Sequence, residues 1–238
     1  GADTTPIYQG LQTAEYSNWY EGRMIPATRG TTGATGHDGI APQPMRVPGF
    51  DPGEKYEHVT QQLFGSPSRP TTTNPPVDTR ATMAGFAYDY DAAYETWDQL
   101  DQIMEAYTPT QLPILNGLAK AYAVSDAWHS SVPTQTNPNR AFSLCGTSLG
   151  RVNNTWDAVE QFKTKTIWNA IPASTSWGIY YQDIWHDEQC YTQYTFPGCN
   201  DALANGEIQP IATFYTKARD GSLPRFTYLE PKWGYGLG

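Results

Sequence analysis

Segments patterned like strands alternate with segments of helical periodicity between about residue 89 and residue 229 of this 238-residue chain. Apolar side chains recur every three or four residues from Tyr94 to Tyr107, and again from Pro113 onward, as on one face of an amphipathic helix. Short apolar runs predict strands at residues 122–128, 177–181 and 225–229, and further helices are expected at 138–145, 166–171 and 208–219. This alternation is typical of βαβ units, so we expect an α/β fold with a parallel sheet flanked by helices.

The first 85 residues are rich in Gly, Pro and Thr and contain few periodic apolar runs. Such residues favour turns, so we expect a long irregular covering segment over residues 1–85. One short helix is expected within it, beginning near Glu54 and running through Leu63. Residues 86–238 are expected to form the βα core, and the whole chain one domain.

Charge and composition limit the partners of the chain. Its net charge of −9 repels phosphate backbones, which argues against a nucleic-acid partner. No stretch reaches the roughly 18 consecutive apolar residues that a membrane-spanning helix needs. The many Tyr, Trp, Thr, Pro and Gly residues, with few Lys, favour a secreted or periplasmic protein.

Three cysteines and one glycosylation triplet also bear on whether the protein is exported. Cys190 and Cys199 bracket a short turn-rich stretch and either form a disulfide in an oxidising compartment or remain two unrelated thiols. Cys145 falls in an expected helix and is interpreted as a buried apolar side chain. Asn153 begins an Asn-Asn-Thr triplet, a glycosylation acceptor if the protein is exported from a eukaryotic cell.

The most informative stretch for chemistry is residues 130–140, between an expected strand and an expected helix. The hydroxyl of Thr136 would project there beside unpaired helix N–H groups, which favour a phosphate. Arg140 adds a permanent positive charge and Asn139 adds amide donors. The alternative is that Thr136 or Asn137, with Pro138 following, simply caps the helix.

Several motifs, in order along the chain, carry a resemblance to a known family. They are Asp-Pro-Gly-Glu at 51–54, Met-Ala-Gly-Phe at 83–86, Leu-Pro-Ile-Leu-Asn-Gly-Leu-Ala at 112–119, Thr-Asn-Pro-Asn-Arg at 136–140, Gly-Thr-Ser-Leu-Gly at 146–150 and Leu-Pro-Arg-Phe-Thr-Tyr-Leu-Glu-Pro at 223–231. Over roughly residues 45–231 the chain resembles the phosphoesterase family of non-haemolytic phospholipases C and acid phosphatases.

That resemblance implies an alkaline-phosphatase-like fold and a phosphoric ester hydrolase. It places the nucleophile at Thr136, whose oxygen would attack the phosphoester, form a phosphothreonine and bind a divalent cation of unknown identity. We expect Asn137, Asn139 and Arg140 to bind the phosphate. His129, after an expected strand, either joins them or is a loop histidine bonded to backbone.

Two motifs of the family are missing from this sequence: an early Glu-Asn-Arg-Ser-Phe-Asp type segment and a later Asp-Glu-His-Gly-Gly type segment. The Glu and Asn of the first segment would ligate the metal, and Glu15 and Asn18 fit that segment poorly. One threonine cannot hold a hard cation alone, so the remaining ligands are expected outside this chain. We therefore expect a partial chain, inactive by itself or completed by a second chain or a missing C-terminal half.

Weaker candidates lie elsewhere. His58 and Asp126 have either site or structural roles, and the charged stretch 183–188 around His186 is either a metal cluster or a solvated loop. An alternative function is a lectin-like or storage protein that keeps the scaffold without turnover. Tyr180, Tyr181 and Trp185 would then stack on a sugar, although core packing is the better interpretation of the two tyrosines.

Overall fold

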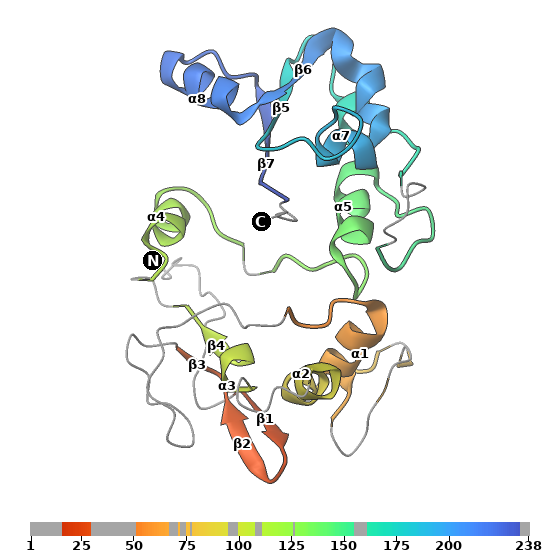
Figure 1. The fold of residues 1–238 in the computed structure, drawn as a ribbon, viewed down its shortest axis with the longest axis vertical. Helices are drawn as coiled ribbons and strands as arrows, with labels where there is room; N and C mark the ends of the chain where they lie inside the picture. The colour runs from red at the N-terminus through yellow and green to blue at the C-terminus, as the bar shows by residue number, and fades with distance from the viewer. Residues whose placement is uncertain are drawn as a thin grey trace, which may run out of the picture. The chain divides into compact units, whose positions relative to one another are not determined.

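A computed structural model describes residues 16–29, 51–66, 71, 75–76, 78–94, 100–107, 111–125, 127–154 and 161–233. The chain divides into two compact units, Gly1–Thr134 and Gln135–Gly238, and each is described by itself (Figure 1). The expectation of one domain stays a prediction. None of the helices in the described ranges is long and apolar enough to cross a membrane.

The first unit contains an antiparallel hairpin of β1 (Ser17–Tyr20) and β2 (Arg23–Pro26), visible in red and orange in Figure 1. A short parallel pair joins β3 (Thr28–Arg29) to β4 (Glu105–Ala106). The hairpin was not expected within the irregular segment. Its strands have four residues each and include polar and charged side chains, so they lack a strong apolar alternation.

The helices of the first unit are α1 (Tyr56–Phe64), α2 (Phe86–Tyr94), α3 (Leu100–Ile103) and α4 (Pro113–Ala121). Helices α1 and α4 confirm the predictions for these segments. A small core holds this unit together, and its buried members are Tyr20, Ile25, Ala87, Tyr90 and Leu100.

Two expectations for this unit were wrong. The helix expected from Tyr94 to Tyr107 is not continuous, because Glu105 and Ala106 pair with β3 as a strand, and pairing overrides local periodicity. Residues 95–99 lie outside the described residues. The strand expected at 122–128 is absent from its described residues, where Tyr122 and Trp128 are both 82% exposed. A strand needs a hydrogen-bonded neighbour, and none of the described strands pairs with this segment.

The second unit is built on a parallel three-stranded sheet in the order β6-β5-β7. Its strands are β5 (Trp177–Tyr181), β6 (Gly206–Pro210) and β7 (Phe226–Glu230). Helix α8 (Ile211–Asp220) connects β6 to β7 and packs against β5 and β6 (Figure 1). The α/β class and the parallel sheet are therefore confirmed.

Four further helical elements complete this unit: α5 (Thr136–Cys145), α6 (Ile167–Ala170), α7 (Tyr191–Thr195) and the 3-10 helix η3 (Pro197–Asn205). The predictions of α5, α6, β5 and β7 are confirmed to within two residues at each end. The helix expected at 208–219 begins instead at Ile211, because residues 206–210 pair with β5.

The core of the second unit lies between the sheet and these helices. Its largest buried side chains are Trp168, Trp177, Phe162, Phe196 and Ile179. Trp168 and Trp177 lie with their ring centroids 5.9 Å apart. Four of these five side chains are aromatic, and aromatic side chains bury large apolar areas.

Candidate functional site

Thr136 is the first residue of α5, and its side chain is exposed. Pro138 lies in the first turn of the helix, where its missing N–H costs nothing. The helix ends at Gly146, whose φ of 72° is left-handed and suits glycine. The predicted strand-to-helix placement is thus half confirmed: the helix is present and the preceding strand is not.

The capping alternative for Thr136 and Asn137 is not supported. The N-cap position is held by Gln135, which makes no side-chain capping bond. The cap comes instead from a distant residue, Asn154, whose Oδ1 accepts a hydrogen bond from the backbone N–H of Asn137 at 2.9 Å. Neither the Thr136 hydroxyl nor the Asn137 side-chain amide therefore caps the helix.

Asn154 contacts both sequence neighbours of Thr136. Besides accepting from Asn137, its backbone N–H donates to Oε1 of the Gln135 side chain at 2.8 Å. Asn139 adds a bond within the same turn, since its Nδ2 donates to the carbonyl oxygen of Gln135 at 3.1 Å. The turn that carries Thr136 is fixed by amide groups on both sides.

The Asn137 side chain points into the protein and is 3% exposed. Its Nδ2 donates to the hydroxyl of Tyr191 at 2.6 Å, and that hydroxyl donates to its Oδ1 at 2.9 Å. In this arrangement both polar atoms of a buried amide are paired. The amide of Asn137 is thus engaged with α7 and is not presented to solvent beside Thr136.

Arg140 also faces α7. Its Nη2 donates to Oγ1 of Thr192 at 2.6 Å and to the hydroxyl of Tyr228 at 3.2 Å. Its Nη1 is buried and has no hydrogen-bond partner among the described residues. The guanidinium also lies near three aromatic rings, with Cζ 4.8 to 5.2 Å from the centroids of Trp233, Tyr191 and Phe196.

Glu230 connects this cluster to the sheet. It is the last residue of β7 and is 1% exposed. Its Oε1 accepts from the backbone N–H of Tyr191 at 3.0 Å, and its Oε2 from that of Thr192 at 2.6 Å. A carboxylate at the first turn of a helix is favoured by the helix dipole, although α7 is short. The Thr136 turn is therefore linked through α7 to the carboxyl end of β7, where ligands of parallel sheets bind.

Sequence reasoning missed Asn154, Tyr191 and Glu230 as members of this site. Glu230 was part of a recognised motif, but nothing in the motif gave it a role. Asn154 and Tyr191 lie outside the motif around Thr136, and only the fold brings them together with it. No spacing in the chain signals either contact.

A cation at Thr136 was expected only with further ligands from outside this chain, and that expectation stays a prediction. The described residues contain no group of three or more His, Cys, Asp or Glu side chains that could hold a metal ion. The partners of the Thr136 turn are amides, and the carboxylate of Glu230 is committed to two N–H groups. Hard divalent cations need several free oxygen ligands, so the residues present do not fit one.

Glu15 and Asn18 were the candidates for the early metal ligands. Asn18 is 1% exposed and bonds the backbone, through Nδ2 to the carbonyl oxygen of Met83 at 2.9 Å and through Oδ1 to the N–H of Ala87 at 3.0 Å. It is therefore a structural residue in this unit. Glu15 lies outside the described residues.

Two of the histidine candidates, His58 and His129, lie in the first unit. His129 is exposed, and its role at the Thr136 site stays a prediction. His58 has a structural contact, because its Nδ1 lies 2.9 Å from Oδ1 of the buried Asp89. Gln62 donates to the other oxygen of that carboxylate at 2.8 Å. Asp126 lies outside the described residues.

The charged stretch at 183–188 forms no metal cluster. His186 pairs with Asp187 at 2.9 Å, and both side chains are at least half exposed. The interpretation as a solvated loop stays a prediction. The triplet residue Asn153 is half-buried, and its glycosylation stays a prediction.

The expected disulfide is not formed in this structure. Cys190 and Cys199 are free thiols, both fully buried in the same core cluster. Burial raises the pKa of each thiol to about 12, and the nearby charge of Glu230 adds to the effect at Cys190. Cys145 is half-buried and packs against the same cluster, as an apolar side chain would.

The aromatic residues considered for sugar stacking do not form an exposed platform. Tyr180 is fully buried, and Tyr181 packs against the core cluster. Trp185 lies edge-on to Tyr191, with 4.8 Å between ring centroids. Core packing is therefore confirmed for the two tyrosines, and no observation favours a sugar-binding function.

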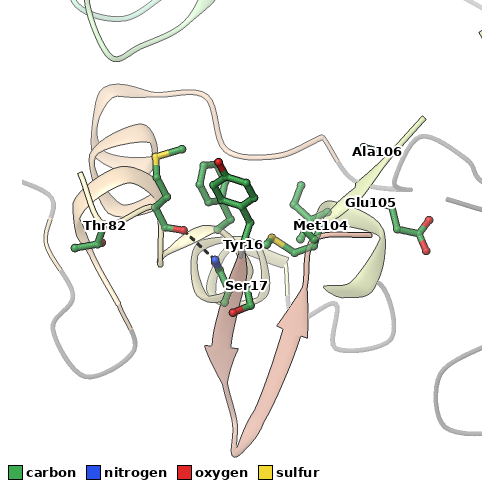
Figure 2. A pocket seen from close by; sticks show the side chains of 11 residues that line it. Tyr16, Ser17, Thr82, Met104, Glu105 and Ala106 are labelled. Carbon is green, nitrogen blue, oxygen red and sulfur yellow. Dashed lines mark hydrogen bonds between the residues drawn. The ribbon is translucent and has the colours of Figure 1, made fainter. Parts of the chain in front are cut away.

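A hollow in the first unit is a second candidate for a binding site. It has a volume of about 320 Å³, and Figure 2 shows Tyr16, Thr82 and Met104 on its wall. Its lining is mostly apolar, and Glu105 is its acidic residue. Because catalytic chemistry needs several converging polar groups, the hollow is a weaker candidate than the Thr136 turn.

Comparison with known proteins agrees with the motif pattern. A family model described as the Phosphoesterase family matches residues 31–236. The chain is similar to non-specific phospholipase C3 of Arabidopsis thaliana, with 27% identity over 192 residues, 77% of this chain and 34% of that protein. It is 35% identical to non-specific phospholipase C1 of the same plant over 137 residues, 57% of this chain and 24% of that protein. The chain thus spans about a third or less of these relatives.

Proposed function

Because this chain belongs to the phosphoesterase family, we propose that the protein hydrolyses a phosphoric ester with the hydroxyl of Thr136 as its nucleophile. The observation that carries the proposal is the exposed Thr136 at the first residue of α5, in a turn held on both sides by Asn154. A hydroxyl placed there meets the positive end of the helix dipole, which favours a bound phosphoryl group.

In the proposed reaction the Thr136 oxygen attacks phosphorus in line with the ester oxygen that leaves. The O–P bond of the ester breaks as the Thr136 O–P bond forms, the hydroxyl proton passes through solvent to the departing alcohol oxygen, and a phosphothreonine remains. Water then cleaves this intermediate and releases the phosphorylated product. Arg140, one turn further along α5, adds a fixed positive charge behind the site, because its guanidinium is held toward α7 by Thr192 and Tyr228.

A divalent cation on the threonine oxygen belongs to this proposal only if oxygen ligands come from outside the described residues. When bound, such an ion would lower the pKa of the hydroxyl and balance phosphoryl charge. No step above depends on it. The same proposal includes an alkaline-phosphatase-like core, which the parallel sheet supports. It also includes a secreted or periplasmic location.

The substrate class follows from the relatives. Those reported above are non-specific phospholipases C, so the phosphodiester of a phospholipid is the first substrate to test. A phosphomonoester is the second. The two differ in product, because the first releases a phosphorylated head group and the second releases inorganic phosphate.

The test compares Thr136→Ala, Thr136→Ser and Thr216→Ala on phosphatidylcholine and on p-nitrophenyl phosphate, with and without added divalent cations. Loss of the nucleophile is expected to lower kcat by on the order of 1000-fold or more. Thr136→Ser should retain part of the activity. Thr216 lies on the exposed side of α8, so its variant is the control. Full activity of Thr136→Ala would overturn the proposal.

A further inference from the structure

We propose that Asn154 and Tyr191 are positioning residues for Thr136, holding the residues on either side of it in the geometry that attack on phosphorus needs. This inference rests on the proposed function, because it concerns the nucleophile of that reaction. Neither residue belongs to the Thr-Asn-Pro-Asn-Arg motif, and each acts through Gln135 or Asn137.

Asn154 fixes the backbone on the C-terminal side of Thr136. The peptide N–H that directly follows Thr136 belongs to Asn137 and donates to Asn154 Oδ1 at 2.9 Å. The backbone of Asn154 holds the Gln135 side chain at 2.8 Å. The first bond restrains the peptide that follows Thr136, and the second holds the side chain of the residue before it.

Tyr191 fixes the same turn from α7. Its hydroxyl satisfies both polar atoms of the buried Asn137 side chain. Tyr191 is itself immobilised, by the bond of its N–H to Glu230 and by ring contacts with Trp185 and Trp233 at 4.8 and 4.5 Å between centroids. A continuous set of contacts therefore connects the end of β7 to the residue next to Thr136.

Such positioning matters for in-line attack. A displacement of about 1 Å at the reacting atom can cost roughly 100-fold in rate, even when the displaced group itself is intact. Thr136 is exposed, so core packing alone does not hold its side chain in place. Its geometry depends on the neighbours that Asn154 and Tyr191 bind.

The first experiment measures hydrogen exchange of the Asn137 backbone amide by NMR in Asn154→Ala and Asn154→Asp. Asn154→Ala should speed this exchange on the order of 5-fold, because one hydrogen bond is lost. Asn154→Asp keeps an acceptor oxygen and should preserve protection. Asn205→Ala, which removes a side-chain bond to Thr175 elsewhere in the unit, is the matched control and should leave Asn137 unchanged.

The second experiment separates kcat from KM in Tyr191→Phe, with p-nitrophenyl phosphate as the probe. Loss of the hydroxyl should lower kcat about 10-fold or more while KM changes by less than about 3-fold, since positioning acts on the reacting atom. The side-chain amide signal of Asn137 should shift in the same variant. Tyr215→Phe removes an exposed hydroxyl on α8 and is the control.

The outcomes separate this inference from the proposed function. If the wild-type protein hydrolyses neither test substrate, the proposed function fails, and the exchange of Asn137 still decides whether Asn154 and Tyr191 hold the turn. Unchanged exchange in Asn154→Ala overturns the positioning role, whatever the activity. Unchanged kcat in Tyr191→Phe, in an active protein with a shifted Asn137 signal, overturns the link to catalysis. Faster exchange together with lower kcat supports both.

Discussion

The hydroxyl of Tyr191 lies 2.6 Å from Nδ2 and 2.9 Å from Oδ1 of Asn137, so one phenol pairs with both polar atoms of a buried amide. Tyr191 belongs to α7 and Asn137 to α5, and their contact joins residues 54 positions apart in sequence. The backbone of Tyr191 is in turn bound to Glu230. Substitutions far from Thr136 are therefore expected to reach its turn through this set of contacts.

Replacing Glu230 with Ala should destabilise the second unit strongly. The change leaves two buried N–H groups, those of Tyr191 and Thr192, without an acceptor. Because each buried unsatisfied donor is costly, we expect the free energy of unfolding to fall by about 2–5 kcal/mol, measured by urea denaturation. Glu188→Gln, at an exposed carboxylate, is the control. Equal stability of the two variants would show that Glu230 does not cap α7.

The three thiols should be unreactive in the folded protein. Burial raises the pKa of Cys145 to about 11 and those of Cys190 and Cys199 to about 12. Since the thiolate is the reacting form, a disulfide reagent such as dithionitrobenzoate at pH 8 should modify none of them quickly. After unfolding in guanidinium without reductant, all three should titrate. Titration of a single thiol would instead reveal the Cys190–Cys199 disulfide, which was one of the two alternatives from the sequence.

The parts of the fold that could be predicted are those with local signals. Pro138 and Gly146 mark the two ends of α5, and Thr166 with Asn169 forms the capping box of α6. The apolar run of β5 identifies a buried strand. Each of these elements is determined by residues within a few positions of one another.

The remaining parts depend on contacts between distant segments. Residues 206–210 are a strand because β5 lies beside them, although the periodicity of 208–219 favoured a helix throughout. The segment 122–128 has the composition of a buried strand but no partner among the described strands. At the site, Thr136 was identified from its motif. Asn154 and Tyr191 were not, because their spacing from Thr136 carries no pattern.

Gly206→Ala should destabilise the sheet of the second unit. A Cβ at this position would lie 1.9 Å from the ring of Trp177, which is 1% exposed and packed in the core. The ring or the strand would have to move, so we expect a loss of about 1–3 kcal/mol in thermal or urea unfolding. Gly117→Ala, in α4 with open space around it, should be neutral or stabilising. A neutral Gly206→Ala would contradict the tight approach of β6 to Trp177.

Glu207 should make the stability of the second unit depend on pH in the acid range. Burial alone would raise the pKa of this carboxyl, but hydrogen bonds from Lys217 and Tyr180 outweigh it and hold the pKa below its usual value. A folded-state pKa below the unfolded one means that the stabilisation is complete above the unfolded value. This stabilisation is lost as the pH falls through the pKa of Glu207 in the folded protein.

Urea midpoints between pH 7 and pH 3 should therefore fall more steeply in the wild type than in Lys217→Met, which removes one of the two donors to Glu207. Lys163→Met, at an exposed lysine, should keep the wild-type slope. Parallel curves for the wild type and Lys217→Met would show that the pair does not lower this pKa.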